Sequence, residues 1–202
     1  MKKENKQVAK LFDTLTEKYG FNIKSLAYGL KKSQLKKFQA LIDIGLERER
    51  KRITILDVGC GFGDLAEFMK KKNIDFKYKG IDISSKIVAI ANKEKPHLDI
   101  SELDILEMKG NNLFDYVLTT GFNCVKTGHN QKMLVQVATK MFELAKKGVA
   151  ISSVSTYRTD KNKDTYYASP ENFFRYCMKN LTKHVVLKHD YLPHDFTIYL
   201  YK

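Results

Sequence analysis

Three alternating glycines, Gly59, Gly61 and Gly63, lie between a short apolar run and a helical pattern, a spacing typical of a ligand-binding turn. Without a Cβ the backbone can turn tightly and a ligand can approach the main chain, while the helix N-terminus offers free N–H groups to an anion. Asp57 and Asp64 flank the turn and would repel a pyrophosphate, and Asp64 replaces the third glycine of the dinucleotide fingerprint. A ligand with an ammonium group and one carboxylate fits better. The alternative is a tight turn without a ligand.

Two more carboxylates follow at the ends of predicted strands. Asp82 comes 19 residues after Gly63, where an acid can accept hydrogen bonds from both hydroxyls of a ribose. Asp104 ends the next predicted strand and is placed to accept a hydrogen bond from an adenine amino group. Ile83 and Ile105 can then hold the ring between them. The pattern indicates a nucleoside-containing ligand.

The elements that must position these residues alternate between strands and helices. Short β-branched runs predict strands, and apolar residues at helical spacing predict helices. The predicted strands are 53–58, 78–83, 98–105, 114–120, 148–154, 184–187 and 196–201. The predicted helices are 64–72, with Asp64 as N-cap, 84–95, 130–147 and 170–178. This order predicts a mostly parallel sheet that is covered on both faces.

The first 50 residues have a different pattern, that of two amphipathic helices. The first has an apolar stripe of Val8, Leu11, Phe12 and Leu15. The second, over 33–50, has a stripe of Leu35, Phe38, Leu41, Ile42 and Leu46. We expect a helical cap over residues 1–50 and a ligand-binding domain over 51–202.

The motifs agree in order and spacing with one known family. Segments 56–65, 80–84 and 103–105 resemble the glycine-rich, ribose and adenine motifs of class I S-adenosylmethionine-dependent methyltransferases, and 114–124 and 144–153 resemble their fourth and fifth strands. The resemblance covers roughly residues 50–202. It implies an α/β fold: a Rossmann-like, doubly wound, seven-stranded sheet whose last strand is antiparallel, preceded by an N-terminal helical cap.

The resemblance also implies S-adenosyl-L-methionine as cofactor and S-adenosyl-L-homocysteine as product. The implied cofactor-binding residues are Asp57, Gly59, Cys60, Gly61, Gly63, Asp82, Ile83, Asp104, Ile105 and Thr120.

The end of the fourth predicted strand bears on the acceptor. DNA amino-methyltransferases have an Asn/Asp/Ser-Pro-Pro-aromatic motif at this place, whereas this chain has Gly121, Phe122 and Asn123 and no proline. Methylation of a DNA base amine is therefore not expected, and no cysteine follows a proline as the nucleophile of a cytosine-C5 enzyme does. We expect Phe122 and Asn123 to bind the substrate.

A segment between the last two predicted strands holds two histidines. If the sixth strand is parallel and the seventh antiparallel, residues 189–195 lie at the same sheet edge as the cofactor. His194 or His189 can then act as a general base. A solvated turn is the alternative. A metal site is not expected, because nothing fixes ligand geometry.

Tyrosines in three places are candidates for covering the acceptor. Tyr19 and Tyr28 lie between the two N-terminal helices, and Tyr191 lies between the last strands. Tyr157 belongs to the long polar segment 155–169, which reads as a lid or as a surface excursion. We expect all four to bind the substrate.

The formal net charge of +13 suggests nucleic acid, but only five of the 36 basic residues are arginine. Arginine is preferred for phosphate and base contacts, so a lysine-rich coat is the simpler interpretation. We expect methyl transfer to an O or N atom of a small molecule. RNA methylation, and a non-catalytic cofactor-binding module, are the alternatives.

Partners other than the acceptor are not expected. No apolar run approaches the roughly 20 residues of a membrane span, and no obligate protein partner is evident. Three cysteines without metal-type spacing and the lack of a signal-peptide core predict a cytoplasmic protein.

Overall fold

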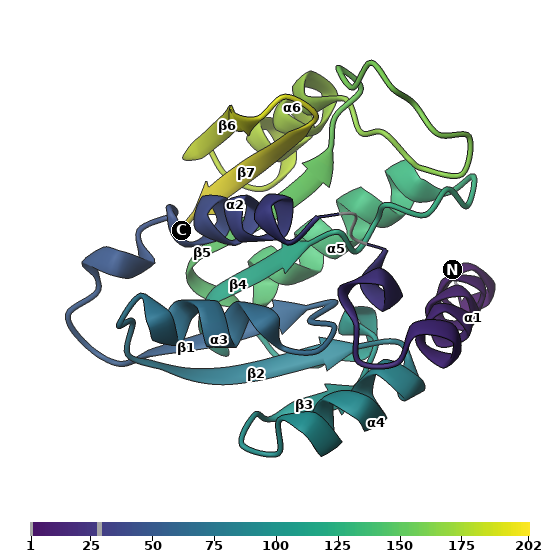
Figure 1. Cartoon of the computed structure of the whole chain (residues 1–202). Coiled ribbons are helices and arrows are strands. Elements are labelled where there is room, and N and C mark those ends of the chain that lie inside the picture. The colour runs from purple at the N-terminus through teal and green to yellow at the C-terminus, as the bar shows by residue number, and fades with distance from the viewer. Residues whose placement is uncertain (1, 28–29) are drawn as a thin grey trace.

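The centre of the protein is a seven-stranded sheet with the order β3-β2-β1-β4-β5-β7-β6 (Figure 1). The computed structural model describes residues 2–27 and 30–202, apart from the side chains of residues 2 and 3. The strands are β1 (Ile53–Val58), β2 (Phe76–Asp82), β3 (Ile100–Glu102), β4 (Phe114–Thr120), β5 (Ala145–Val154), β6 (Val185–Leu192) and β7 (Asp195–Tyr201). Only β7 runs antiparallel to its neighbours, β5 and β6. The predicted Rossmann-like fold is confirmed.

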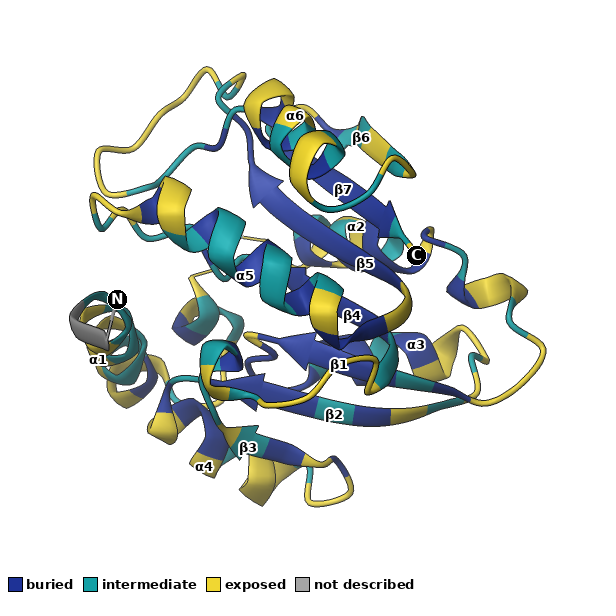
Figure 2. Ribbon diagram, turned by 180° about the vertical axis from the view of Figure 1, so that it is seen from behind, coloured by how far each residue is buried: buried dark blue, intermediate teal, exposed yellow. Residues whose placement is uncertain are grey.

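Helices cover both faces of the sheet. They are α1 (Lys2–Tyr19), α2 (Lys31–Ile42), α3 (Asp64–Lys71), α4 (Ser85–Glu94), α5 (Asn130–Leu144) and α6 (Pro170–Asn180), with 3-10 turns η1 (Ile23–Leu26), η2 (Leu46–Arg48) and η3 (Ile105–Glu107). The helices α2, α3 and α4 pack on one face, and α5 and α6 on the other. Figure 2 shows the strands buried between these helices, whose outer surfaces are exposed.

The two hydrophobic cores follow from the alternation of side chains along each strand. In β1, Ile53 and Ile55 point into the core with α2 and α3, whereas Leu56 and Val58 point into the core with α5. Asp57 shares the face of Ile55, which places a carboxylate at the carboxyl end of the central strand.

Several predicted boundaries were wrong. The third strand is shorter than 98–105 because the Asp104 side chain accepts from the Leu106 N–H at 3.0 Å and starts η3. The predicted helix 130–147 ends at Leu144, since Ala145 already pairs with Phe114 in the sheet. The sixth strand extends from 187 to Leu192, so only two residues separate β6 from β7.

The predicted helix over 33–50 ends at Ile42, and Gly45 with φ 129° separates it from η2. Leu35, expected on its apolar stripe, is exposed, and Gln34 is buried in its place. Gln34 lies four residues before Phe38 and therefore shares its helix face, while Leu35 is turned outward.

Helix α1 lies across the carboxyl ends of β2 and β3. The Asn5 amide donates to Asp104 at 2.6 Å, and the Ser84 hydroxyl donates to Asp13 at 2.6 Å. Glu17 forms an ion pair with Lys86. These polar contacts hold the helix over the site. The division into a cap over 1–50 and a domain over 51–202 stays a prediction, because α2 contributes core residues.

Candidate functional site

The glycine-rich turn leaves the end of β1 in a conformation that only glycine adopts easily. Gly61 has φ 55° and Gly63 has φ 72°. A Cβ on Gly63 would lie 2.6 Å from Leu98 Cδ1, so a side chain has no space there. Gly63, and not Asp64 as predicted, is the N-cap of α3. Asp64 instead pairs with the Lys95 ammonium at 2.7 Å.

Asp57 lies buried beneath this turn. Its carboxylate accepts a hydrogen bond from the Tyr78 hydroxyl at 2.8 Å. Burial raises the pKa of Asp57 from 3.8 to about 7, and the nearby charges of Asp82 and Asp64 act in the same direction. The site thus holds a carboxyl group that a cationic ligand would stabilise in its charged form.

The raised pKa of Asp57 predicts an unusual pH dependence of the free energy of unfolding. Between pH 3.8 and about 7 the folded protein keeps a proton on Asp57 that the unfolded chain has lost. The free energy of unfolding therefore falls as the pH rises through this window, by up to about 1.4 kcal/mol per unit, and the loss is complete above it. Asp57→Asn should remove this slope while keeping an acceptor for Tyr78.

Urea unfolding of the wild type and Asp57→Asn, without ligand, from about pH 4 to about pH 8, measures the effect. The variant should gain stability relative to the wild type as the pH rises. Asp99→Asn is the matched control, because Asp99 is an exposed acid paired with Lys79. If the wild type and Asp57→Asn differ in free energy of unfolding by the same amount at every pH, the prediction is contradicted.

Asp82 is the second buried acid at the carboxyl edge. One carboxylate oxygen accepts from the Gly61 N–H at 3.0 Å and the other from the Ser84 N–H at 3.0 Å. Burial raises the pKa of Asp82, while these backbone donors lower it. Since each carboxylate oxygen has a further lone pair, Asp82 can accept two more hydrogen bonds from a ligand.

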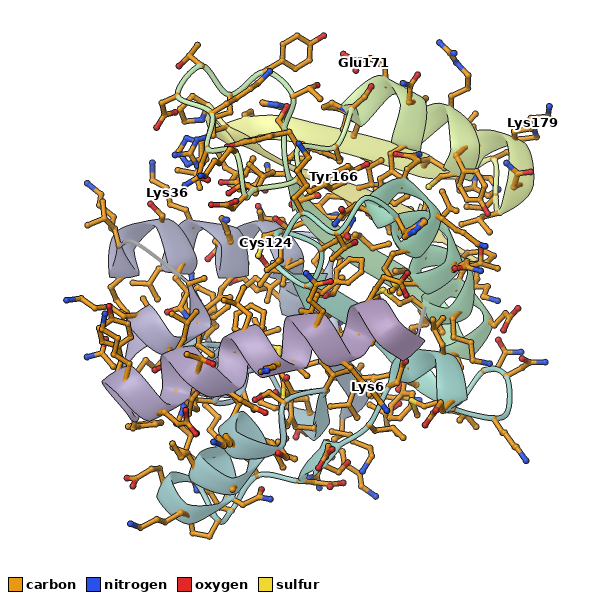
Figure 3. The ribbon with its side chains drawn as sticks, turned by 90° about the vertical axis from the view of Figure 1, so that its right-hand side faces the viewer. Lys6, Lys36, Cys124, Tyr166, Glu171 and Lys179 are labelled. Carbon is orange, nitrogen blue, oxygen red and sulfur yellow. The ribbon has the colours of Figure 1, made fainter. Side chains whose placement is uncertain are left out.

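A cavity of about 610 Å³ opens at this edge, between the sheet, α1 and α2. Nine of the ten residues expected to bind the cofactor line it, and Gly63 does not. The nine are Asp57, Gly59, Cys60, Gly61, Asp82, Ile83, Asp104, Ile105 and Thr120. Figure 3 shows α1 crossing this side of the protein, with Cys124 above it in this view.

The lining fits S-adenosylmethionine in its chemistry. Ile83 and Ile105 are apolar surfaces for an adenine ring, and the carboxylates of Asp82 and Asp104 can accept from hydroxyl and amino groups. Asp57 lies beneath the bare backbone of the turn, where a cationic ligand would stabilise its charged form. A pyrophosphate would meet three carboxylates, whereas a ligand with an ammonium and a sulfonium group would be attracted.

The residues expected to contact an acceptor follow β4 or precede β7, away from β2 and β3 in the strand order. Phe122 and Asn123 line it, as does His194. The His194 Nε2 is 3.4 Å from Asp195, and Asp195 is buried and pairs with the Lys37 ammonium at 2.9 Å. The edge location predicted for the β6–β7 connection is confirmed, because Asp195 pairs with Val154 at the end of β5.

Four other candidates lie outside the cavity. His189 contacts the Ser155 hydroxyl at 2.9 Å and stacks on Phe196. The Tyr191 hydroxyl bonds within the sheet, and burial raises its pKa to about 12. Tyr157 is exposed and bonded to Glu171, and Tyr19 lies on the surface under two lysines. Tyr28 falls outside the described residues.

Polar side chains of the first two helices also line the cavity. Asn5 reaches it from α1, and Gln34 and Lys37 reach it from α2. Gln34 is nearly fully buried and lies 3.4 Å from Asp64. The sequence indicated Gln34 only by its spacing, because a polar residue four positions before Phe38 falls on the buried face of α2. Within residues 2–27 and 30–202, no group of three His, Cys, Asp or Glu side chains is arranged to hold a metal.

Comparisons with known proteins agree with this geometry. A family model described as a methyltransferase domain matches residues 55–154. A protein of Mycobacterium tuberculosis named as a methyltransferase is 27% identical over 159 residues, which cover 74% of this chain and 93% of that one. The demethylmenaquinone methyltransferase of Thermotoga maritima is 34% identical over 92 residues, 45% of this chain and 38% of that one.

A solved structure shares the fold over almost the whole chain. The magnesium protoporphyrin IX methyltransferase of Synechocystis PCC 6803 with bound S-adenosylmethionine superposes with a TM-score of 0.71, at 12% identity, over 98% of this chain and 97% of that one. The fold, the glycine-rich turn with its row of carboxylates and the family match agree. The chain is a class I S-adenosylmethionine-dependent methyltransferase.

Proposed function

We propose that this enzyme transfers the methyl group to an O or N atom of a small-molecule acceptor. The observation that carries the proposal is the cavity of about 610 Å³, which is lined both by the acidic cofactor residues and by His194. Its volume is within the range of small-molecule sites. Among the similar proteins, two are named for demethylmenaquinone and magnesium protoporphyrin IX, which are different small molecules.

The cofactor end of the cavity is assigned as follows. Asp82 accepts from the ribose hydroxyls, and Asp104 accepts from the adenine amino group between Ile83 and Ile105. The main chain at Gly59 and Gly61 lies against the methionine part, near the charge of Asp57. When bound, S-adenosylmethionine supplies a methyl group on a positively charged sulfur, already activated for nucleophilic attack.

The acceptor end is assigned to Phe122, Asn123 and His194. Phe122 offers an apolar surface next to the glycine-rich turn. A Cβ on Gly59 would lie 3.3 Å from the Cβ of Phe122. Asn123 is fixed by hydrogen bonds with Asn130 at 3.0 and 3.2 Å, so its position is rigid. His194 takes the proton from the acceptor, and Asp195 stabilises the imidazolium that forms. Most of the rate enhancement comes from alignment of the acceptor.

Methyl incorporation from radiolabelled S-adenosylmethionine into fractionated extract of the source cell tests the proposal. We expect label in the small-metabolite fraction and none in the RNA fraction. Label in RNA that ribonuclease removes would replace the proposal by RNA methylation. If S-adenosylhomocysteine binds but no fraction is labelled, the non-catalytic binding module is favoured.

A further inference from the structure

The outward side of the first two helices is almost purely basic. Residues 18–42 contain six lysines and no aspartate or glutamate. Among the described residues from 4 to 40, the exposed charged side chains are seven lysines and Glu17, which is paired with Lys86. Asp13, the other acid of mid-α1, is bonded to Ser84. These two acids therefore attach α1 to the start of α4, while the lysines face outward.

Large apolar side chains are exposed among these lysines. Leu30 is 69% exposed, Phe21 48% and Leu35 40%. We call this surface the cap tip, and it consists of Lys18, Tyr19, Phe21, Lys24, Leu30, Lys31, Lys32, Leu35 and Lys36. Exposed apolar side chains grouped in this way mark an interaction site.

Contacts show that the cap tip is one surface. The Lys18 and Lys24 ammonium groups lie 5.2 and 5.8 Å from the centre of the Tyr19 ring. At the other end, Lys31 is 3.8 Å from Asp64. Asp64 binds Lys95, whose ammonium lies 5.7 Å from the centre of the Phe21 ring. The end of α1 and the first turn of α2 thus share neighbours, and Figure 3 shows Lys36 on the outer side of α2.

The apolar part of the cap tip continues into the cavity. Leu30 lines the cavity and is also exposed, and so is Leu11 of α1. An apolar path therefore leads from the site to a surface with a basic rim. An anionic bilayer complements both features, because its headgroups attract lysine and its interface accepts leucine and aromatic rings. A nucleic acid would use the lysines but would leave Leu30 and Leu35 in water.

We propose that the cap tip docks on the surface of an anionic lipid bilayer. None of the helices formed by residues 2–27 and 30–202 is long and apolar enough to span a membrane. The sequence expectation of no membrane partner was based on spanning runs, and docking at the surface requires none. The proposal concerns where the enzyme works and goes beyond the methyl-transfer reaction.

Cosedimentation of the full chain with vesicles tests it. We expect binding to vesicles of phosphatidylcholine mixed with phosphatidylglycerol, little binding to pure phosphatidylcholine, and weaker binding at high salt. Lys31→Gln with Lys32→Gln should lower the partition coefficient roughly thirtyfold, since each lysine near the surface contributes about 1 kcal/mol. Leu30→Ser with Leu35→Ser should lower it at least several-fold.

Matched controls lie outside the cap tip, in the last turn of α3 and at the start of β6. Val186→Ser with Leu187→Ser removes two similarly exposed apolar side chains from β6, and Lys70→Gln with Lys71→Gln removes two lysines from α3. Both controls should bind vesicles like the wild type. Equal binding to neutral vesicles, or binding that the cap-tip variants leave unchanged, would overturn the proposal. So would binding to single-stranded RNA but not to vesicles. None of these results depends on methyl transfer.

Discussion

Replacing Asp82 by alanine is expected to weaken the binding of S-adenosylhomocysteine by about a hundredfold or more. In the proposed site its carboxylate accepts from both ribose hydroxyls, and hydrogen bonds to a charged acceptor contribute about 1.5 kcal/mol or more each. The same carboxylate accepts from the N–H groups of Gly61 and Ser84, so its loss also loosens the turn that faces the cofactor. Isothermal calorimetry measures the dissociation constant directly.

Two further variants make the result specific. Asp82→Asn keeps the side-chain volume and one acceptor oxygen, so its affinity should lie between those of the wild type and Asp82→Ala. Asp99→Ala removes an exposed acid that is paired with Lys79, and it should bind like the wild type. Urea unfolding establishes that each variant is folded. A folded Asp82→Ala with wild-type affinity would show that the ribose is held elsewhere.

The cofactor end could be predicted from the sequence because its signals are local. Gly61, Asp82 and Asp104 each lie at or just after the end of a strand whose β-branched residues identify it. The carboxyl ends of parallel strands meet at one edge of a sheet. Strand order and direction then bring the three residues to one cavity, so nine of the ten expected residues line it. Gly63 is the exception, because its role is to bring α3 against Leu98 and Ile100.

The acceptor end could not be predicted to the same degree, because it is built by contacts distant in sequence. Nothing near Lys37 indicates that its ammonium would pair with Asp195, the acid beside His194. His189 and His194 looked equivalent as long as both were placed in a loop. Extension of β6 to Leu192 put His189 in a strand and left His194 at the edge. Such details depend on pairing register, which short alternating segments do not determine.

The net charge of +13 is likewise resolved only in three dimensions. The cavity contains the carboxylates of Asp57, Asp82 and Asp104, whereas the exposed charges of the first two helices are nearly all lysines. A cationic cofactor is attracted to the interior by the first set. The exposed lysines have the same sign of charge as the cofactor and face solvent, so they do not attract it into the cavity.

Replacing His194 by alanine is expected to lower kcat by about a hundredfold to ten-thousandfold while the affinity for S-adenosylhomocysteine stays the same. His194 lines the cavity next to β7, whereas Asp57, Asp82 and Asp104 lie at the ends of β1, β2 and β3, so its loss should affect proton removal and not cofactor binding. Initial rates of methyl incorporation and calorimetry separate the two effects. Added imidazole should restore part of the rate, because it can enter the space that the side chain leaves.

The second histidine and the neighbouring acid show whether the loss is due to a base. His189→Ala is the matched control, since His189 lies outside the cavity, and its rate should stay near that of the wild type. Asp195→Asn should lower kcat less than His194→Ala, because the imidazole remains but loses the carboxylate 3.4 Å away. A normal rate in His194→Ala would mean that the acceptor reaches the site already deprotonated. Catalysis would then rest on alignment of the acceptor beside Phe122 and Asn123 alone.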